Sequence, residues 1–247
     1  MKCDRFFVAL AGFCTCLGIS SSAAFAGPPY QTDDPEPTEL HHWEIYSFVA
    51  VDGHRRDLDG EAGLDLNYGA AKGLQLTATL PVAFSRDADV GWRSGRGDVE
   101  LGAKYRVLDD EKNGWQAAIF PRLILPTSSS DLGGRKVRVL VPVWVQKDFD
   151  KTSIFGGGGY EINPGTGNRN FWTAGVAMTH DVSATLQLGA EVSWQSSDEV
   201  GGKGTTGIDV GLIRKLGGPF SLLIAAGPSF SGDQVHYHGY GALGLNF

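Results

Sequence analysis

Apolar and polar residues alternate with a period of two along most of the chain after residue 40. In residues 74–84 every even-numbered position is apolar, and in residues 98–107 one face is apolar while Asp98, Glu100, Lys104 and Arg106 share the other. Because a β-strand places successive side chains on opposite faces, this pattern predicts strands with one apolar and one polar face.

About twelve such segments are predicted, each about the length that crosses a bilayer as a tilted strand. They cover residues 40–51, 58–69, 73–84, 97–108, 114–125, 137–148, 152–162, 169–180, 184–195, 205–216, 219–230 and 236–247. Alternation is also expected of a soluble β-sandwich, and periodicity alone does not say which face meets the solvent.

The links between the segments separate these two possibilities. Tight links (70–72, 109–113, 149–151, 181–183, 217–218) alternate with links that are on average longer and more polar (52–57, 85–96, 126–136, 163–168, 196–204, 231–235). Short periplasmic turns opposite longer external loops are typical of bacterial outer-membrane barrels. We therefore expect an all-β chain that forms a single closed antiparallel transmembrane β-barrel of about 12 strands.

The last strand ends on an aromatic residue. Tyr237, Leu243, Leu245 and the terminal Phe247 share one face, which we expect to meet lipid, while Tyr240 and Asn246 point inward. In outer-membrane proteins a final strand of this kind closes the barrel and resembles the signal that the barrel assembly machinery reads. The expected partners are therefore outer-membrane lipid and that machinery, and the expected location is the bacterial outer membrane.

Residues 1–26 are expected to be a secretory signal peptide. Lys2 and Arg5 precede an apolar stretch that ends in Ala24-Phe25-Ala26, which predicts cleavage after Ala26. The alternative is an uncleaved membrane anchor. All three cysteines lie in this stretch, so the mature chain would have no disulfide or thiol chemistry.

Residues 27–39 form a second unit before the barrel of residues 40–247. Four prolines and several carboxylates exclude both a helix and a central strand there. We expect a periplasmic segment that folds into the barrel mouth as a constriction or plug. Its acids Asp33, Asp34 and Glu36 would then pair with inward Lys104, Arg106, Arg122 or Arg138.

If the apolar faces meet lipid, the opposite faces line the interior with charges of both signs. These candidate lumen residues are Glu44, Asp65, Asp98, Glu100, Lys104, Arg106, Arg122, Arg138, Glu191 and Asp209. Two interpretations stay open: ion-pair networks that fill the interior, or a constriction that selects solutes.

Other chemistry has little support in the sequence. The net charge of −7 argues against a nucleic-acid partner. The pairs His41-His42 and His236/His238 would meet where the first and last strands pair, but no carboxylate or cysteine spacing supports a metal site. No spacing singles out a catalytic triad, and no nucleotide motif is present. We expect no enzyme activity, no metal and no cofactor.

Two stretches resemble a known family. They are Gly27-Pro-Pro-Tyr-Gln-Thr-Asp-Asp-Pro-Glu-Pro-Thr38 running into Trp43-Glu-Ile-Tyr46, and Gly97-Asp-Val-Glu-Leu-Gly-Ala-Lys-Tyr-Arg106. Both are similar to the outer-membrane proteins assigned to the MetA pathway of phenol degradation. The resemblance implies an outer-membrane barrel that takes up aromatic or other hydrophobic compounds.

The expected function is therefore a passive outer-membrane channel for small, hydrophobic or aromatic solutes. A structural or surface-binding barrel with a blocked lumen is the alternative, and a barrel hydrolase or acyltransferase is a third. The sequence does not identify the solute or the oligomeric state.

Overall fold

The computed structural model describes residues 29–129 and 132–247. The expected signal peptide and its cleavage site lie outside the described residues. The strands are β1 (Trp43–His54), β2 (Asp57–Ala71), β3 (Leu74–Asp87), β4 (Gly91–Arg96), β5 (Val99–Asp110), β6 (Trp115–Ile119), β7 (Arg122–Leu125), β8 (Arg138–Phe149), β9 (Thr152–Ile162), β10 (Phe171–Ser183), β11 (Leu186–Gln195), β12 (Thr205–Gly217), β13 (Phe220–Ser231) and β14 (Gln234–Asn246). In the two described ranges, no helix is long and apolar enough to cross a membrane.

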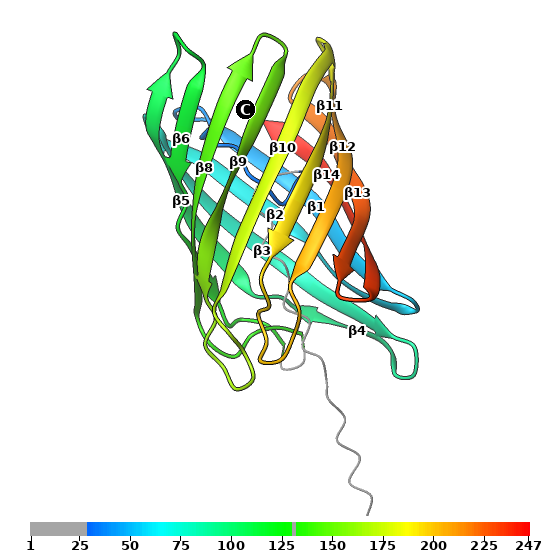
Figure 1. The fold of residues 1–247 in the computed structure, drawn as a ribbon. Coiled ribbons are helices and arrows are strands. Elements are labelled where there is room, and N and C mark those ends of the chain that lie inside the picture. Colours follow the sequence, from blue (N-terminus) through cyan, green and yellow to red (C-terminus); the bar gives the residue numbers. More distant parts are fainter. Residues whose placement is uncertain (1–28, 130–131) are drawn as a thin grey trace, which may run out of the picture.

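The strands form one closed antiparallel barrel (Figure 1). Consecutive strands of the wall pair with each other, with two exceptions: β3 pairs with β5 because β4 lies outside the wall, and β6 and β7 each pair with β5 and β8. β1 pairs with β14, so the last strand joins the first and the wall has no open edge. The ring has twelve positions, because β6 and β7 together occupy one of them and β4 lies outside it. The prediction of a closed barrel of about 12 strands is confirmed.

Two details differ from the expected strand pattern. The predicted strand over 114–125 is interrupted between β6 and β7 at Phe120-Pro121, where proline has no N–H to donate to the ladder. The expected external loop 85–96 is partly a strand: β4 pairs with the end of β3, and the two extend as a hairpin beyond the wall. The apolar alternation stops at Phe84, because Arg86, Ser94 and Arg96 occupy later even-numbered positions, so the pattern gives no clear signal for β4.

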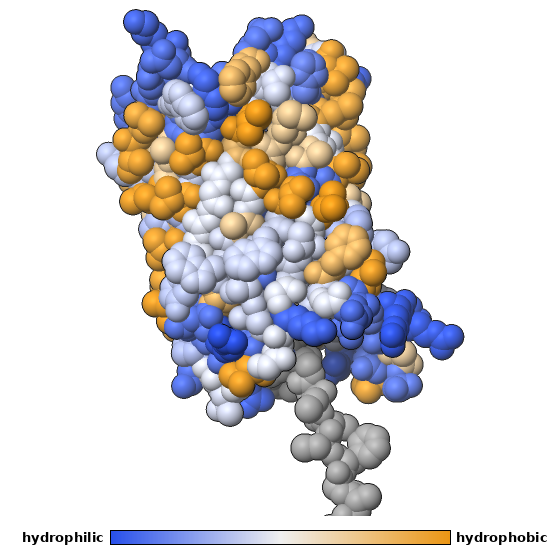
Figure 2. Space-filling model, viewed as in Figure 1, coloured by the Kyte–Doolittle hydropathy of each residue, from blue (hydrophilic) through white to orange (hydrophobic). Residues whose placement is uncertain are grey.

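The links at the upper end of Figure 1 are all short, and the longest links, those after β7, β9 and β11, lie at the lower end. Two links expected to be longer, 52–57 and 231–235, are two-residue turns at that lower end. The alternating faces are sorted as expected for a membrane barrel. Leu76, Leu80 and Val82 of β3 are exposed on the outside, while Gln75 and Thr77 are buried inside. Figure 2 shows, on one face, hydrophobic side chains over the middle of the wall and hydrophilic residues at both ends. The apolar surface therefore faces outward and the polar surface encloses the lumen.

Candidate functional site: the barrel lumen

The N-terminal segment, residues 29–39, lies inside the barrel near the end with the short turns (Figure 1). Its deepest described contacts are with Glu191 of β11: the N–H of Gln31 donates to Oε2 at 2.9 Å, and the N–H and hydroxyl of Thr32 donate to Oε1 at 2.5 and 2.6 Å. Closer to β1, the N–H of Thr38 donates to Gln75 Oε1 at 2.8 Å. The segment is thus held by polar contacts at both ends.

Glycines on three neighbouring strands make room for this segment. A Cβ atom at Gly175 of β10 would overlap Thr32 Oγ1. A Cβ at Gly189 of β11 would lie 2.5 Å from the Tyr30 hydroxyl, and one at Gly211 of β12 would lie 3.0 Å from the Tyr30 ring. These inward positions therefore form a seat for Tyr30 and Thr32 that larger residues would fill.

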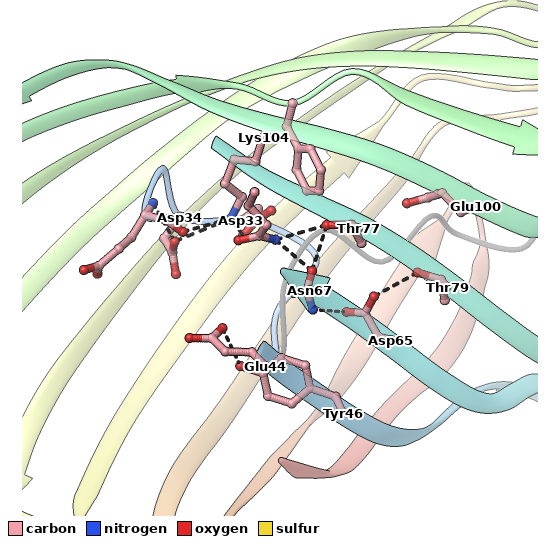
Figure 3. Close-up of a pocket in the computed structure, with 13 residues that line it drawn as sticks. Asp33, Asp34, Glu44, Tyr46, Asp65, Asn67, Thr77, Thr79, Glu100 and Lys104 are labelled. Atoms are coloured by element: carbon pink, nitrogen blue, oxygen red, sulfur yellow. Dashed lines mark hydrogen bonds and ion pairs between the residues drawn. The ribbon is translucent and has the colours of Figure 1, made fainter. Parts of the chain in front are cut away.

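Lys104 of β5 is the cation at which the acidic part of the segment converges (Figure 3). Its Nζ lies 3.0 Å from Asp33 Oδ1 and 3.7 Å from Asp34 Oδ1, and it donates to the Glu36 carbonyl at 3.4 Å. The ring of Phe120 lies 5.2 Å away on another side. Burial raises the pKa of the Asp33 carboxyl to about 6, against the opposing effect of the Lys104 ammonium. Of the four basic residues expected to meet the segment, Lys104 is the one in direct contact with its acids.

A polar cavity lies beside this contact. Its lining joins Asp33, Asp34 and Glu36 of the segment to side chains of β1, β2, β3 and β5. Asp65 accepts hydrogen bonds from Asn67 at 3.2 Å and Thr79 at 3.0 Å, and Glu44 accepts from the Tyr46 hydroxyl at 3.3 Å. These acids are held by neutral donors rather than by cations, so the cavity wall carries a negative charge.

The arginines of the lumen are paired within the wall. Arg122 lies 3.2 Å from Glu100, and Arg138 lies 3.4 Å from Asp98 and 3.2 Å from Glu161. Asp98 also accepts hydrogen bonds from the N–H groups of Ser128 and Gly134, so it holds the loop that follows β7 against the wall.

The fourth predicted basic residue, Arg106, pairs with Asp109 at 2.9 Å and donates to Gln116 at 3.0 Å. It therefore belongs to the short-turn end of the wall rather than to the contact with the segment's acids. Glu161 was missed, although its inward position follows from the alternation of β9.

An apolar patch inside the lumen was also missed. Phe48 of β1 stacks on Tyr240 of β14 with ring centroids 6.3 Å apart, and Leu223, Ala50 and Ala242 complete the buried cluster. Only Tyr240 had been placed inward from the sequence. Phe48 stands on the inward face of β1, between Tyr46 and Ala50, so the same alternation would have located it.

The expectation that the two histidine pairs meet is wrong. In the register of β1 with β14, Glu44 stands opposite Asn246 and Asp52 stands opposite His238, so the two pairs lie at opposite ends of the seam. An antiparallel pairing brings the end of the last strand, not its beginning, to His41 and His42. Within 29–129 and 132–247, no three histidine, cysteine or acidic side chains gather as metal ligands.

The closing strand has the predicted faces. Tyr237, Leu243 and Phe247 are exposed on the outside, Leu245 is half-buried, and Tyr240 is buried inside. Phe247 exchanges two backbone hydrogen bonds with Trp43, at 2.8 and 3.0 Å, which completes the seam. Their role in assembly stays a prediction.

Taken together, a closed barrel with an apolar exterior and a charged interior has the architecture of bacterial outer-membrane barrels. The structure is similar to that of the COG4313 outer membrane channel from Pseudomonas putida F1, with a TM-score of 0.73 and 14% identity over 87% of this chain and 98% of that chain.

It is also similar to the KdgM porin in complex with disordered oligogalacturonate (TM-score 0.57, 12% identity, 83% of this chain and 99% of that chain). A third similar structure is the translocator domain of the autotransporter NalP from Neisseria meningitidis (TM-score 0.54, 12% identity, 83% and 88%).

No protein-family model and no curated protein matches the chain. The resemblance to the phenol-degradation family therefore stays a prediction. At these identities the similar structures establish the fold alone.

Proposed function

We propose that the protein is a passive channel of the bacterial outer membrane for small solutes, and that residues 29–39 are a displaceable plug in its lumen. This proposal rests on how the segment is held. It forms hydrogen bonds with Glu191 and Gln75 and ion pairs with Lys104, and it packs against inward glycines of the wall. The hydrogen bonds can be exchanged for water at low net cost, and the apolar contact that the segment gives up on leaving is that of Tyr30 with Phe155, Ala177 and Ala225. None of these contacts belongs to the strand ladder, so the segment can leave without unfolding the barrel.

Several observations support a membrane channel. The outward apolar belt suits lipid, the inward face is polar, and similar folds include a channel and a porin. The expected signal peptide supports export, and the outward face of the last strand, with Tyr237, Leu243 and Phe247, supports recognition by the barrel assembly machinery.

Deleting residues 28–38 tests the plug. Single-channel recordings in planar bilayers should show a larger conductance and faster solute flux than the full mature chain. An unchanged conductance and flux would sink the idea. Heat-modifiable gel migration of both proteins shows that each barrel is folded.

We further propose that the solutes have a hydrophobic or aromatic part. The support is the buried lumen patch of Phe48, Tyr240 and Leu223, together with the family resemblance. Liposome swelling with phenyl glucoside against maltose compares an aromatic and a non-aromatic neutral solute. Faster entry of phenyl glucoside, reduced by Phe48→Ser, is expected; equal rates would remove the aromatic preference.

A blocked, non-transporting barrel is the alternative, because paired charged side chains of the wall fill part of the lumen in addition to the segment. In that case neither the full chain nor the deletion variant would pass either solute.

A further inference from the structure

Some buried carboxylates of the lumen form an ion pair with a lysine or arginine side chain, and others do not. Asp33, Glu100, Asp98 and Glu161 each lie within 3.4 Å of a lysine or arginine nitrogen. Glu191 and Asp209 are equally buried, yet no ion pair joins either of them to a lysine or arginine of the described chain. A buried carboxylate is costly unless it is paired or hydrogen-bonded. This pair therefore marks a place where a positive charge would be stabilised.

The two carboxylates stand directly opposite each other on β11 and β12. Side chains in such a cross-strand pair have Cβ atoms about 4.5–5.5 Å apart, so one small cation can reach both. Glu191 is satisfied by the N–H groups of Gln31 and Thr32 and by the Thr32 hydroxyl. Asp209 is 2% exposed, and its Oδ1 has no hydrogen-bond partner among the described residues.

Two inward glycines lie close to Asp209. A Cβ at Gly227 of β13 would lie 2.8 Å from Oδ1, and a Cβ at Gly207 of β12 would lie 3.8 Å from Oδ2. Side chains at these inward positions would contact or cover the carboxylate, and glycine avoids this. Asp209 is buried while the segment is docked, and Tyr30 lies against the neighbouring inward position Gly211, so a cation from the lumen reaches Asp209 once the segment leaves.

We propose that Asp209, together with Glu191, binds the ammonium group of a permeating solute and makes the open channel cation-selective. The inference rests on the proposed channel function. With the segment docked, one carboxylate is left free, which matches one monovalent cation with N–H donors. Ca²⁺ takes six to eight oxygen ligands, and this pair supplies at most four of them. When the segment leaves, Glu191 loses its donors and adds a second negative charge to the same site.

The test uses the channel lacking residues 28–38, in which no part of that segment lies beside Asp209. The reversal potential in a KCl gradient gives its ratio of potassium to chloride permeability. Asp209→Asn, Glu191→Gln and the double variant are compared with Asp233→Asn, which removes a carboxylate from an exposed external loop. Each lumen substitution should lower the ratio about fivefold, the effect of one nearby charge under water-like screening. Asp233→Asn should leave it nearly unchanged.

Solute flux gives an independent readout. Tyramine and 4-hydroxyphenylacetate carry the same ring with opposite charge. The deletion channel should pass tyramine faster in liposomes, and the double variant should lose this preference. A conducting channel whose ion ratio and tyramine preference do not change in the double variant would overturn the inference while leaving the channel function intact. A deletion variant that folds but conducts no ions would overturn both.

Discussion

Replacing Lys104 with methionine removes the cation at which the acids of the N-terminal segment converge. Methionine keeps much of the length and the apolar stem of lysine, so the packing against Phe120 is largely preserved. Asp33 would remain buried, with Oδ2 already lacking a partner among the described residues and Oδ1 now losing its ammonium. The docked state is destabilised, whereas the undocked state, with Asp33 in water, is not.

Removing one partner of a buried ion pair costs about 3–5 kcal/mol. Because about 1.4 kcal/mol is a factor of ten, the docking equilibrium should weaken by about 100-fold or more. In planar bilayers at pH 7, Lys104→Met should raise the fraction of time in the high-conductance state toward that of the channel lacking residues 28–38. Lys72→Met, at an exposed turn, is the matched control and should behave like the parent.

The double variant Asp33→Asn/Lys104→Met tests whether the unpaired Asp33 carboxylate is what weakens docking in Lys104→Met. With no buried charge left at this contact, docking should recover partly, and the two substitutions should be strongly non-additive. Unchanged gating in Lys104→Met would refute the reasoning. A double variant that opens as fully as the single one would also refute it.

Three further predictions follow from the same contacts and from the seam. The pKa of Asp33 is raised to about 6 in the docked state, so docking is stabilised below that pH and loses this stabilisation as the pH rises through 6. Acidification from pH 7 to pH 5 should therefore shift the docking equilibrium about tenfold toward the closed channel. Asp33→Asn should reduce this shift. Gly175→Ala places a Cβ on Thr32 Oγ1 and should open the channel, whereas Gly241→Ala, whose Cβ would meet Val49 at an ordinary 3.8 Å, should not; equal conductance in the two variants would contradict the glycine seat. Deleting Phe247 removes two hydrogen bonds to Trp43 and should lower the yield of folded barrel on heat-modifiable gels; an undiminished yield would argue against a role in closure.

The sequence could predict the wall because the wall is governed by local rules. Alternation places Leu80 outside and Gln75 inside whatever strands lie next to them. Short links between the segments imply that consecutive strands lie side by side around the barrel. The interruption at Phe120-Pro121 and the added strand β4 were missed. The interruption could have been predicted from Pro121, which has no N–H to donate. β4 depends on its pairing with the end of β3, which the sequence pattern does not show.

The lumen could be predicted only as a set of inward residues. Lys104, Arg106, Arg122 and Arg138 were equivalent candidates for the segment's acids, and the structure brings Lys104 alone to Asp33 and Asp34. The two histidine pairs were expected to meet and lie at opposite ends of the seam, because antiparallel register decides height along the barrel.

By itself, therefore, the sequence determined the fold class, the number of wall segments and the face on which each side chain lies, since the period of two is a property of each strand alone. The tertiary structure decided which inward charges meet. It gave Arg122 and Arg138 their carboxylates, seated Tyr30 and Thr32 against glycines, and left Asp209 with Oδ1 unpartnered among the described residues. These contacts join residues on different strands or segments, and their distances are set by barrel closure and strand stagger rather than by any local pattern.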